Sequence, residues 1–201
     1  MTDRLIIYTD GGCSMDTGDS GWAFVIPGKY EEYGFKANST NNEMELTAML
    51  NALTYAGKDT RVKVYSDSTY VVKGLTEWVY GWIRRGWITS SGTPVANKEL
   101  WEALYKAYNP AVHEILYVKG HAGIEGNERC DELVQLAKIE KKSKVVIDRT
   151  QKIVEGDAKI TDMIDIISMK YDQLLPIERR NLAPKILTKL AILTNKIQQD
   201  A

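Results

Sequence analysis

The sequence predicts an α/β fold with a five-stranded mixed sheet flanked by helices, followed by a small all-α extension. Short runs of aromatic and β-branched residues, each bounded by glycine or proline, are typical of strands. Strands come first and then alternate with helical segments, which indicates a mixed sheet. Beyond residue 143 apolar residues recur at i, i+3 and i+4, as in amphipathic helices. We therefore expect a first domain over residues 1–143 and a helical extension over residues 144–201.

The first part of the chain supplies four strands and one helix. The strand-like segments are RLIIYTD, GWAFVIP and YEEYGFKA, and a fourth, RVKVYSD, ends on Asp67. Before the fourth strand, Thr40 and Glu43 form a T-x-x-E capping box at the start of a helix that Gly57 ends.

The next part supplies three helical segments and the fifth strand. A helical stretch passes through Trp78 and Trp82, and a second helix covers about residues 97–108. The fifth strand is EILYV, and the loop KGHAGIEG leads into a helix over about residues 127–141.

The composition is that of an ordinary globular protein, with 44% hydrophobic and 26% charged residues in 201. The two cysteines, Cys13 and Cys130, give neither a disulfide framework nor a paired-cysteine zinc motif. The N-terminus shows no signal-peptide pattern, and no apolar run approaches 18 residues. We therefore expect a cytoplasmic protein that does not contact a membrane.

Charge is unevenly distributed along the chain. Residues 1–140 hold 14 basic and 19 acidic side chains, whereas residues 141–201 hold 12 and 8. An acidic body with a basic extension indicates either that the two parts dock or that the extension meets a polyanion or a partner protein.

Aspartates end two of the predicted strands, the first at Asp10 and the fourth at Asp67. An Asp-Gly pair is common in turns, so Asp10 has the alternative of starting a turn through Gly11 and Gly12. In open α/β sheets, however, ligands bind beyond the carboxyl ends of the strands. Both aspartates are therefore candidates for one site.

Two further carboxylates join them. At 100° per residue, Glu45 falls in the apolar arc of its helix, whereas Glu43 falls on the solvent side. Asp131 lies in the first turn of the last helix, where its alternative role is a favourable charge near a helix N-terminus.

Clustered carboxylates require a counter-charge, because two like charges 4 Å apart repel by about 4 kcal/mol at an effective dielectric of 20. Cysteine and histidine are too scarce to indicate zinc, since His113 and His121 are the only histidines. An all-oxygen cluster suits Mg²⁺ or Mn²⁺. Two such ions suit in-line displacement at phosphorus.

Five motifs carry a resemblance to a known family. They are YTDGGC, TNNEMEL, VYSDSTYVV, RRGW followed by NKELW, and VKGHAGIEGNERCDELV. In order and spacing they resemble the bacterial type 1 ribonucleases H, over about residues 3–140. The resemblance implies the five-stranded ribonuclease H fold. It also implies metal-dependent endonucleolytic cleavage of the RNA strand of RNA–DNA hybrids, leaving 5′-phosphomonoesters. The basic helical extension matches nothing in that family.

The resemblance also assigns the catalytic residues. It implies that four carboxylates bind the metal ions, two Mg²⁺ with substrate or alternatively Mn²⁺: Asp10, Glu45, Asp67 and Asp131. It implies that His121 assists proton transfer and product departure, against the alternative of a solvated loop histidine. His113 matches no family position and is expected to be structural.

Substrate contacts follow from the same resemblance. Asn41 and Asn42 match residues that contact the hybrid across its minor groove, where the 2′-hydroxyl distinguishes RNA, although asparagine is also common at a helix start. The resemblance places Thr40 and Asp16 at a phosphate pocket, where an acidic residue is unusual, and Cys13 beside them. Trp78, Trp82, Arg84 and Arg85 match the basic protrusion that holds the DNA strand.

Alternatives remain at this stage. Trp78 and Trp82, four residues apart on a helix, are also typical of a core. The protrusion has fewer lysines than is usual, so weaker electrostatic binding is expected there. Other functions with the same fold are a non-catalytic hybrid-binding module and another nuclease or recombinase. No Gly-rich phosphate loop is present, which disfavours nucleotide hydrolysis.

Overall fold

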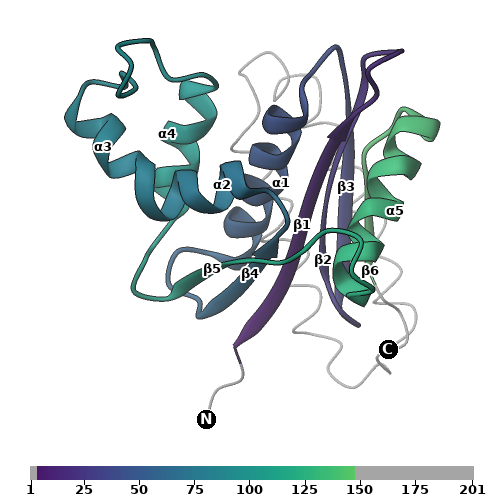
Figure 1. Ribbon diagram of the computed structural model, residues 1–201. Coiled ribbons are helices and arrows are strands. Elements are labelled where there is room, and N and C mark those ends of the chain that lie inside the picture. The colour runs from purple at the N-terminus through teal and green to yellow at the C-terminus, as the bar shows by residue number, and fades with distance from the viewer. Residues whose placement is uncertain (1–3, 148–201) are drawn as a thin grey trace, which may run out of the picture. The chain divides into compact units, whose positions relative to one another are not determined.

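A six-stranded mixed sheet is the centre of the part of the chain that the structure, a computed structural model, describes: residues 4–147 (Figure 1). The strand order is β5-β4-β1-β2-β3-β6. The strands are β1 (Leu5–Cys13), β2 (Asp19–Ile26), β3 (Tyr30–Ala37), β4 (Val62–Ser66), β5 (His113–Tyr117) and β6 (Lys144–Ile147). β1, β4 and β5 run parallel, and the pairings of β1 with β2, β2 with β3 and β3 with β6 are antiparallel.

The sixth strand corrects the sequence prediction, which placed five strands in the sheet and no strand beyond residue 143. β6 pairs with the edge of β3, from Tyr33 opposite Lys144 to Tyr30 opposite Ile147. Its four residues are too few for the alternation that identifies a strand, and the pairing partner is far away in the sequence. The sheet therefore includes residues assigned to the extension, whereas the helices expected further on lie outside the described residues.

Helices cover both faces of this sheet. α1 (Asn41–Ala56) packs on β1 and β2 from one side, and α5 (Glu125–Glu140) packs on β1, β2 and β3 from the other. α2 (Thr69–Lys73), a π-helical turn η1 (Gly74–Trp78) and α3 (Val79–Arg84) follow one another without a break, and α4 (Lys98–Ala107) packs on α1 (Figure 1). No helix within residues 4–147 has the length and apolar character needed to span a membrane.

The start of α1 follows the predicted cap in part. The Thr40 hydroxyl accepts a hydrogen bond from the Glu43 backbone N–H at 3.2 Å, which is one half of the capping box. The Glu43 carboxylate instead accepts from the Ser39 hydroxyl at 2.7 Å and pairs with Lys36. Gly57, at φ 79°, ends the helix as predicted.

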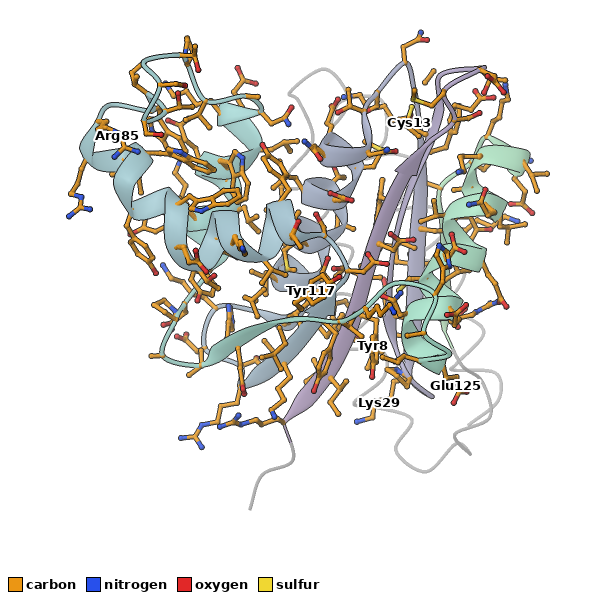
Figure 2. The ribbon with its side chains drawn as sticks, viewed as in Figure 1. Tyr8, Cys13, Lys29, Arg85, Tyr117 and Glu125 are labelled. Carbon is orange, nitrogen blue, oxygen red and sulfur yellow. The ribbon has the colours of Figure 1, made fainter. Side chains whose placement is uncertain are left out.

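β1 continues past Asp10, which corrects the expectation that the strand ends there and turns away. Gly11 and Gly12 remain in β1 and pair with β2, and the strand reaches Cys13 (Figure 2). A Cβ at Gly11 would lie 2.3 Å from the Glu45 backbone nitrogen, so glycine is required for the close approach of α1. A Cβ at Gly12 would instead face Val134 of α5, at 3.3 Å. The two glycines let helices approach opposite faces of the sheet.

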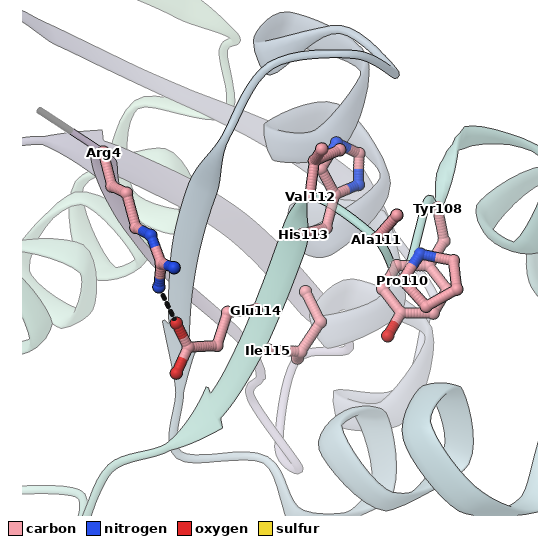
Figure 3. A pocket seen from close by; sticks show the side chains of 8 residues that line it. All are labelled: Arg4, Tyr108, Pro110, Ala111, Val112, His113, Glu114 and Ile115. Carbon is pink, nitrogen blue, oxygen red and sulfur yellow. Dashed lines mark hydrogen bonds and ion pairs between the residues drawn. The ribbon is translucent and has the colours of Figure 1, made fainter. Parts of the chain in front are cut away.

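The amino ends of the parallel strands border a shallow depression of about 360 Å³ at the start of β5 (Figure 3). Arg4 and Glu114 form an ion pair of 2.5 Å across its rim. His113 is buried there and structural, as expected: its Nδ1 accepts from the Asn109 backbone N–H at 3.1 Å, and Nε2 lies 3.1 Å from the Gly57 carbonyl oxygen. This hollow lies at the end of the parallel strands remote from Asp10.

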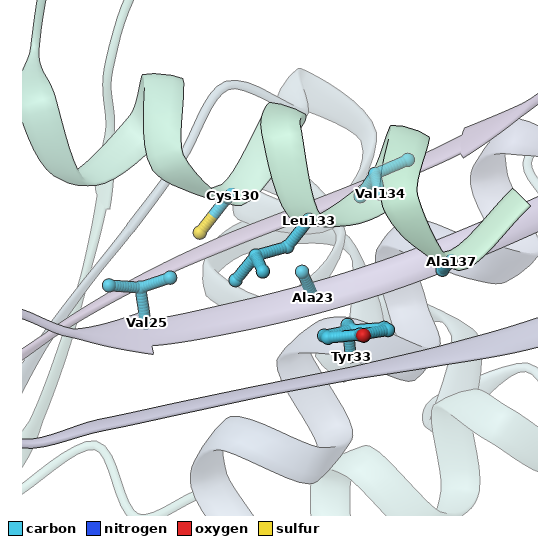
Figure 4. Packing of buried hydrophobic residues seen from close by; sticks show 7 residues of the cluster. All are labelled: Ala23, Val25, Tyr33, Cys130, Leu133, Val134 and Ala137. Carbon is cyan, nitrogen blue, oxygen red and sulfur yellow. The ribbon is translucent and has the colours of Figure 1, made fainter. Parts of the chain in front are cut away.

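The core between the sheet and α5 contains small residues where helix and strand are closest. Figure 4 shows Ala23, Val25, Tyr33, Cys130, Leu133, Val134 and Ala137 packed together. A Cβ at Gly21 would lie 2.7 Å from the Val134 carbonyl oxygen, so the close packing of α5 on β2 requires glycine at this position as well. Both cysteines are free, and Cys130 is wholly buried in this cluster.

We predict that Gly11→Ala destabilises the protein by about 2 kcal/mol or more, because the added methyl group forces α1 away from β1. Chemical denaturation measures the loss. Gly12→Ala is the matched control, since its methyl group meets no backbone atom, only the side chains of Val134 at 3.3 Å and Lys138 at 3.7 Å, and a smaller loss is expected. Equal losses for the two variants would contradict this account of Gly11.

Candidate active site

Asp10 and Asp67 lie next to each other where the parallel pairing of β1 and β4 ends. The last parallel pair of β1 and β4 is Thr9 with Ser66, and the next residue on each strand is one of the two aspartates. Both side chains are partly buried. The predicted convergence of the two aspartates at one end of the sheet is therefore observed.

Glu45 reaches the same region from α1. Its Oε2 accepts a hydrogen bond from the hydroxyl of Ser68, which is buried and immediately follows Asp67. The Ser68 hydroxyl oxygen also accepts from the Val71 backbone N–H at 3.2 Å and so caps α2. Burial raises the pKa of Glu45, and the charge of Asp67 raises it further, against the opposing effect of the Ser68 hydrogen bond.

Asp131 comes from α5, on the opposite face of the sheet from α1. Its Oδ1 accepts a hydrogen bond of 3.2 Å from Gln135, one helical turn later. The Nδ1 of His121 lies 3.9 Å from Asp131 Oδ2. The His121 side chain is 80% exposed, and its backbone has φ 51° in the loop before α5. The structure therefore places the loop histidine beside the fourth carboxylate.

Asp10 lies within the electrostatic field of the other three carboxylates. The pKa of Asp10 rises from 3.8 to about 7, first because of burial and then because of the charge of Asp67. Asp131 and Glu45 raise this pKa further, whereas the Gly11 N–H, which donates to Asp10 Oδ1 at 2.7 Å, lowers it. Asp10 is thus at the centre of an acidic cluster.

The donor chemistry of this cluster fits a hard divalent cation. All four groups are carboxylates, and none of the ion pairs among the described residues joins one of them to lysine or arginine. Within residues 4–147, however, no three His, Cys, Asp or Glu side chains stand in position to hold a metal ion. The four carboxylates are therefore neighbours, but in this structure they do not converge into a metal-binding set.

The residues expected to contact substrate include a group at the end of β1 and the start of α1. The Asn41 Oδ1 accepts from the Cys13 backbone N–H at 2.6 Å, which ties the strand to the helix. Thr40, Asn41 and Asn42 are exposed, as is Asp16 in the turn between β1 and β2. This hydrogen bond leaves the Asn41 amide nitrogen without an intramolecular acceptor among the described residues.

The two tryptophans of the expected protrusion have different surroundings. Trp82 is 8% exposed and packs against Trp101, with ring centroids 5.2 Å apart, so it has the core position that was the alternative. Trp78 is 37% exposed and lies 5.9 Å from Trp82, centroid to centroid. Arg84 and Arg85 are exposed at the end of α3, with Arg85 far from the sheet (Figure 2).

Comparison with known proteins agrees with this geometry. The family model described as RNase H matches residues 2–139. The chain belongs to the ribonuclease H family. A Ribonuclease H of Hahella chejuensis is 48% identical over 133 residues, which cover 65% of this chain and 90% of that protein. Other bacterial proteins of the same name are 42–45% identical. The enzyme class expected from the sequence motifs is confirmed.

Solved structures of lower identity share the fold. A type 1 RNase H with the type 2 active-site motif has a TM-score of 0.59 at 24% identity, over 81% of this chain and 86% of that chain. A foamy viral protease–reverse transcriptase, solved with an RNA/DNA hybrid, has a TM-score of 0.58 at 17% identity, over 68% and 20%. The expected ribonuclease H-like α/β architecture is therefore confirmed, with one strand more than predicted.

Sequence reasoning missed two neutral residues of this ribonuclease H site. Ser68 donates to Glu45, and the buried Asn127 donates from Nδ2 to Asp67 Oδ2 at 3.1 Å. Each lies inside a quoted motif, and Asn127 precedes Asp131 by one helical turn. That i, i+4 spacing was the available signal, because it places both side chains on one face of α5.

We predict that Asp10→Asn stabilises the cation-free protein at alkaline pH. Because the pKa of Asp10 is raised in the folded state, its contribution to stability is complete below about pH 4 and is lost as the pH rises through about 7. One pKa unit corresponds to about 1.4 kcal/mol, and solvent screens part of it, so we expect a gain of about 1–2 kcal/mol at pH 8.

Urea unfolding with a chelator present, at pH 4 and at pH 8, measures this gain. Asp59→Asn, in the exposed connection between α1 and β4, is the matched control and should show little change at either pH. A gain for Asp10→Asn that is the same at both pH values would contradict the repulsion and burial described for Asp10.

Proposed function

We propose that this chain is a metal-dependent endonuclease that hydrolyses the RNA strand of RNA–DNA hybrids and leaves 5′-phosphomonoesters. The observation that carries the proposal is the acidic cluster where the parallel pairing of β1 and β4 ends, in which burial and three neighbouring carboxylates raise the pKa of Asp10 to about 7. Membership of the ribonuclease H family supports the reaction.

The four carboxylates Asp10, Glu45, Asp67 and Asp131 would hold two Mg²⁺ ions, or Mn²⁺, when substrate is bound. Ions bound there would supply a deprotonated water and charge stabilisation at the leaving oxygen. Asp10 must release a proton before it can act as a ligand, since its pKa is near 7 in the cation-free protein. Cation affinity therefore increases as the pH rises through this value.

His121 would move protons at the edge of the cluster. Its exposed ring lies 3.9 Å from Asp131, and it would exchange protons with solvent and with a leaving group held at the cluster. Glycines lie on both sides of His121, and Gly123, which has open space around it, would let the loop move as product departs.

The hybrid would be recognised along the exposed start of α1. Asn41 precedes Glu45 by one helical turn, so the two side chains share a face. The Asn41 amide nitrogen can donate to a 2′-hydroxyl, which only the RNA strand carries. Asn42, Thr40, Cys13 and Asp16 lie around the same end of the sheet and complete the proposed contact surface.

The DNA strand would lie along α3. Trp78 offers a partly exposed ring for stacking on the sugar or base, and Arg84 and Arg85 would contact phosphates. Trp82 lies behind Trp78 and would support it rather than touch the hybrid.

Cleavage of a strand-labelled RNA–DNA hybrid, with matched double-stranded DNA and double-stranded RNA, tests the proposal. We expect cutting of the hybrid's RNA strand alone, and only with Mg²⁺ or Mn²⁺. Asp10→Asn should abolish cutting while hybrid binding persists, because the variant removes a negative charge that only the cations need. Asp59→Asn should cut like the wild type. Binding without cutting by the wild type would identify a non-catalytic hybrid-binding module instead.

Trp78→Ala and Trp82→Ala should have different effects. Base stacking on an aromatic ring contributes about 1–3 kcal/mol, so Trp78→Ala should raise KM for the hybrid about fivefold or more with little loss of stability. Trp82→Ala removes a buried ring and should cost about 3–5 kcal/mol of folding stability. Steady-state kinetics and thermal unfolding of both variants separate the two roles. If Trp82→Ala instead raised KM for the hybrid and Trp78→Ala lowered stability, Trp82 would be the residue that contacts the hybrid.

A further inference from the structure

Asn127 is a buried polar residue whose amide has a single partner. It is the third residue of α5 and is 3% exposed. Its Nδ2 donates to Asp67 Oδ2 at 3.1 Å. The amide cannot be turned around, because its oxygen would then face a carboxylate oxygen and no hydrogen bond would form.

This orientation leaves the other end of the amide unpaired. Asn127 Oδ1 is buried and has no hydrogen-bond partner among residues 4–147. A buried acceptor without a donor is unfavourable, so the only favourable polar contact of this amide among the described residues is its hydrogen bond to Asp67. Stability of the core therefore does not account for asparagine here, and the contact with Asp67 does.

The same contact connects two carboxylates of the acidic cluster. Asn127 precedes Asp131 by one helical turn of α5, so the helix that carries Asp131 also holds Asp67. The start of this helix is firmly placed: a Cβ at Gly126 would lie 2.2 Å from the ring of Tyr8 in β1. A Cβ at Gly120 would lie 2.8 Å from Asp67 Oδ2, so that oxygen is enclosed between Gly120 and Asn127.

We propose that Asn127 is a positioning residue for the divalent-cation site. Its amide fixes the Asp67 carboxylate relative to Asp131, so that less rearrangement is needed when the carboxylates draw together around a cation. As a neutral donor it does so without cancelling the negative charge that attracts the cation. This inference rests on the proposed function, since it assumes that Asp67 and Asp131 are cation ligands.

Asn127→Leu in the full-length chain tests the proposal. We expect a melting temperature without Mg²⁺ that changes little, because removal of the unpaired buried acceptor offsets the loss of the hydrogen bond to Asp67. We expect Mg²⁺ affinity, measured by calorimetric titration and by the Mg²⁺-dependent rise in melting temperature, to fall about tenfold. The Mg²⁺ concentration for half-maximal kcat should rise by a similar factor, while KM for the hybrid at saturating Mg²⁺ stays unchanged.

Gln135→Leu is the matched control. Its Nε2 donates to Asp131 at a similar distance, 3.2 Å, from the same helix, but the contact is exposed. This variant should keep wild-type Mg²⁺ affinity. Should Asn127→Leu fail to fold, Asn127→Ala undergoes the same measurements, with the melting temperature without Mg²⁺ separating loss of packing from loss of cation binding.

Wild-type Mg²⁺ affinity in a folded Asn127 variant would overturn the proposal, and so would a loss of kcat that excess Mg²⁺ does not restore. A wild-type chain that binds no Mg²⁺ would also overturn it. Failure of the proposed function is a separate result: the wild type would then bind Mg²⁺ but leave hybrids uncut, and the titration would still decide the role of Asn127.

Discussion

The repulsion between Asp10 and Asp67 is the constraint on which the rest of the site depends. Parallel pairing of β1 and β4 ends one residue before both, so two partly buried carboxylates are neighbours by the register of the sheet alone. Burial, together with the charge of Asp67, raises the pKa of Asp10 to about 7, so this carboxyl group keeps its proton to a much higher pH than an ordinary aspartate. Gly11 then lets α1 approach closely enough to bring Glu45 to the same place, and α5 brings Asp131 from the other face. A bound cation would offset the burial and the mutual repulsion of these carboxylates, as a proton on Asp10 does.

Periodicity and residue type were sufficient to predict the elements and the direction of the carboxylates, but not the contacts that depend on tertiary packing. The 100° rotation per residue correctly separated the inward Glu45 from the outward Glu43, because α1 is regular and well capped. Turn propensity took Gly11 for a turn residue, because the need for glycine there arises from the α1 backbone at Glu45, 34 residues later in the chain. β6 was missed because a four-residue edge strand has no periodicity of its own, and only the free edge of β3 specifies it.

In the segment after β4, two tryptophans four residues apart have different surroundings, one in the core and one at the surface. Trp78 and Trp82 are four apart, and sequence alone left the choice between core and surface open for both. The π-helical turn over Gly74–Trp78 inserts one extra residue per turn at this point, with Gly74 directly against the ring of Trp101. Trp82 then joins Trp101 in the core, and Trp78 keeps one side toward solvent. The pair is best understood as an exposed ring supported by a buried one.

The carboxylates of the acidic cluster accept hydrogen bonds from neutral side chains, whereas a carboxylate outside the cluster, Glu31, accepts them from an arginine of α5. Arg129, two residues after Asn127, pairs with both oxygens of Glu31 at 2.9 Å and so neutralises a carboxylate for structural purposes. In the cluster the donors to Glu45 and Asp67 are Ser68 and Asn127, which orient a carboxylate and leave its charge in place. An arginine at either position would stabilise the empty site and compete with a cation for the same oxygens. Neutral donors therefore fit a site whose carboxylates are held ready for a ligand, whereas charged donors fit a permanent contact.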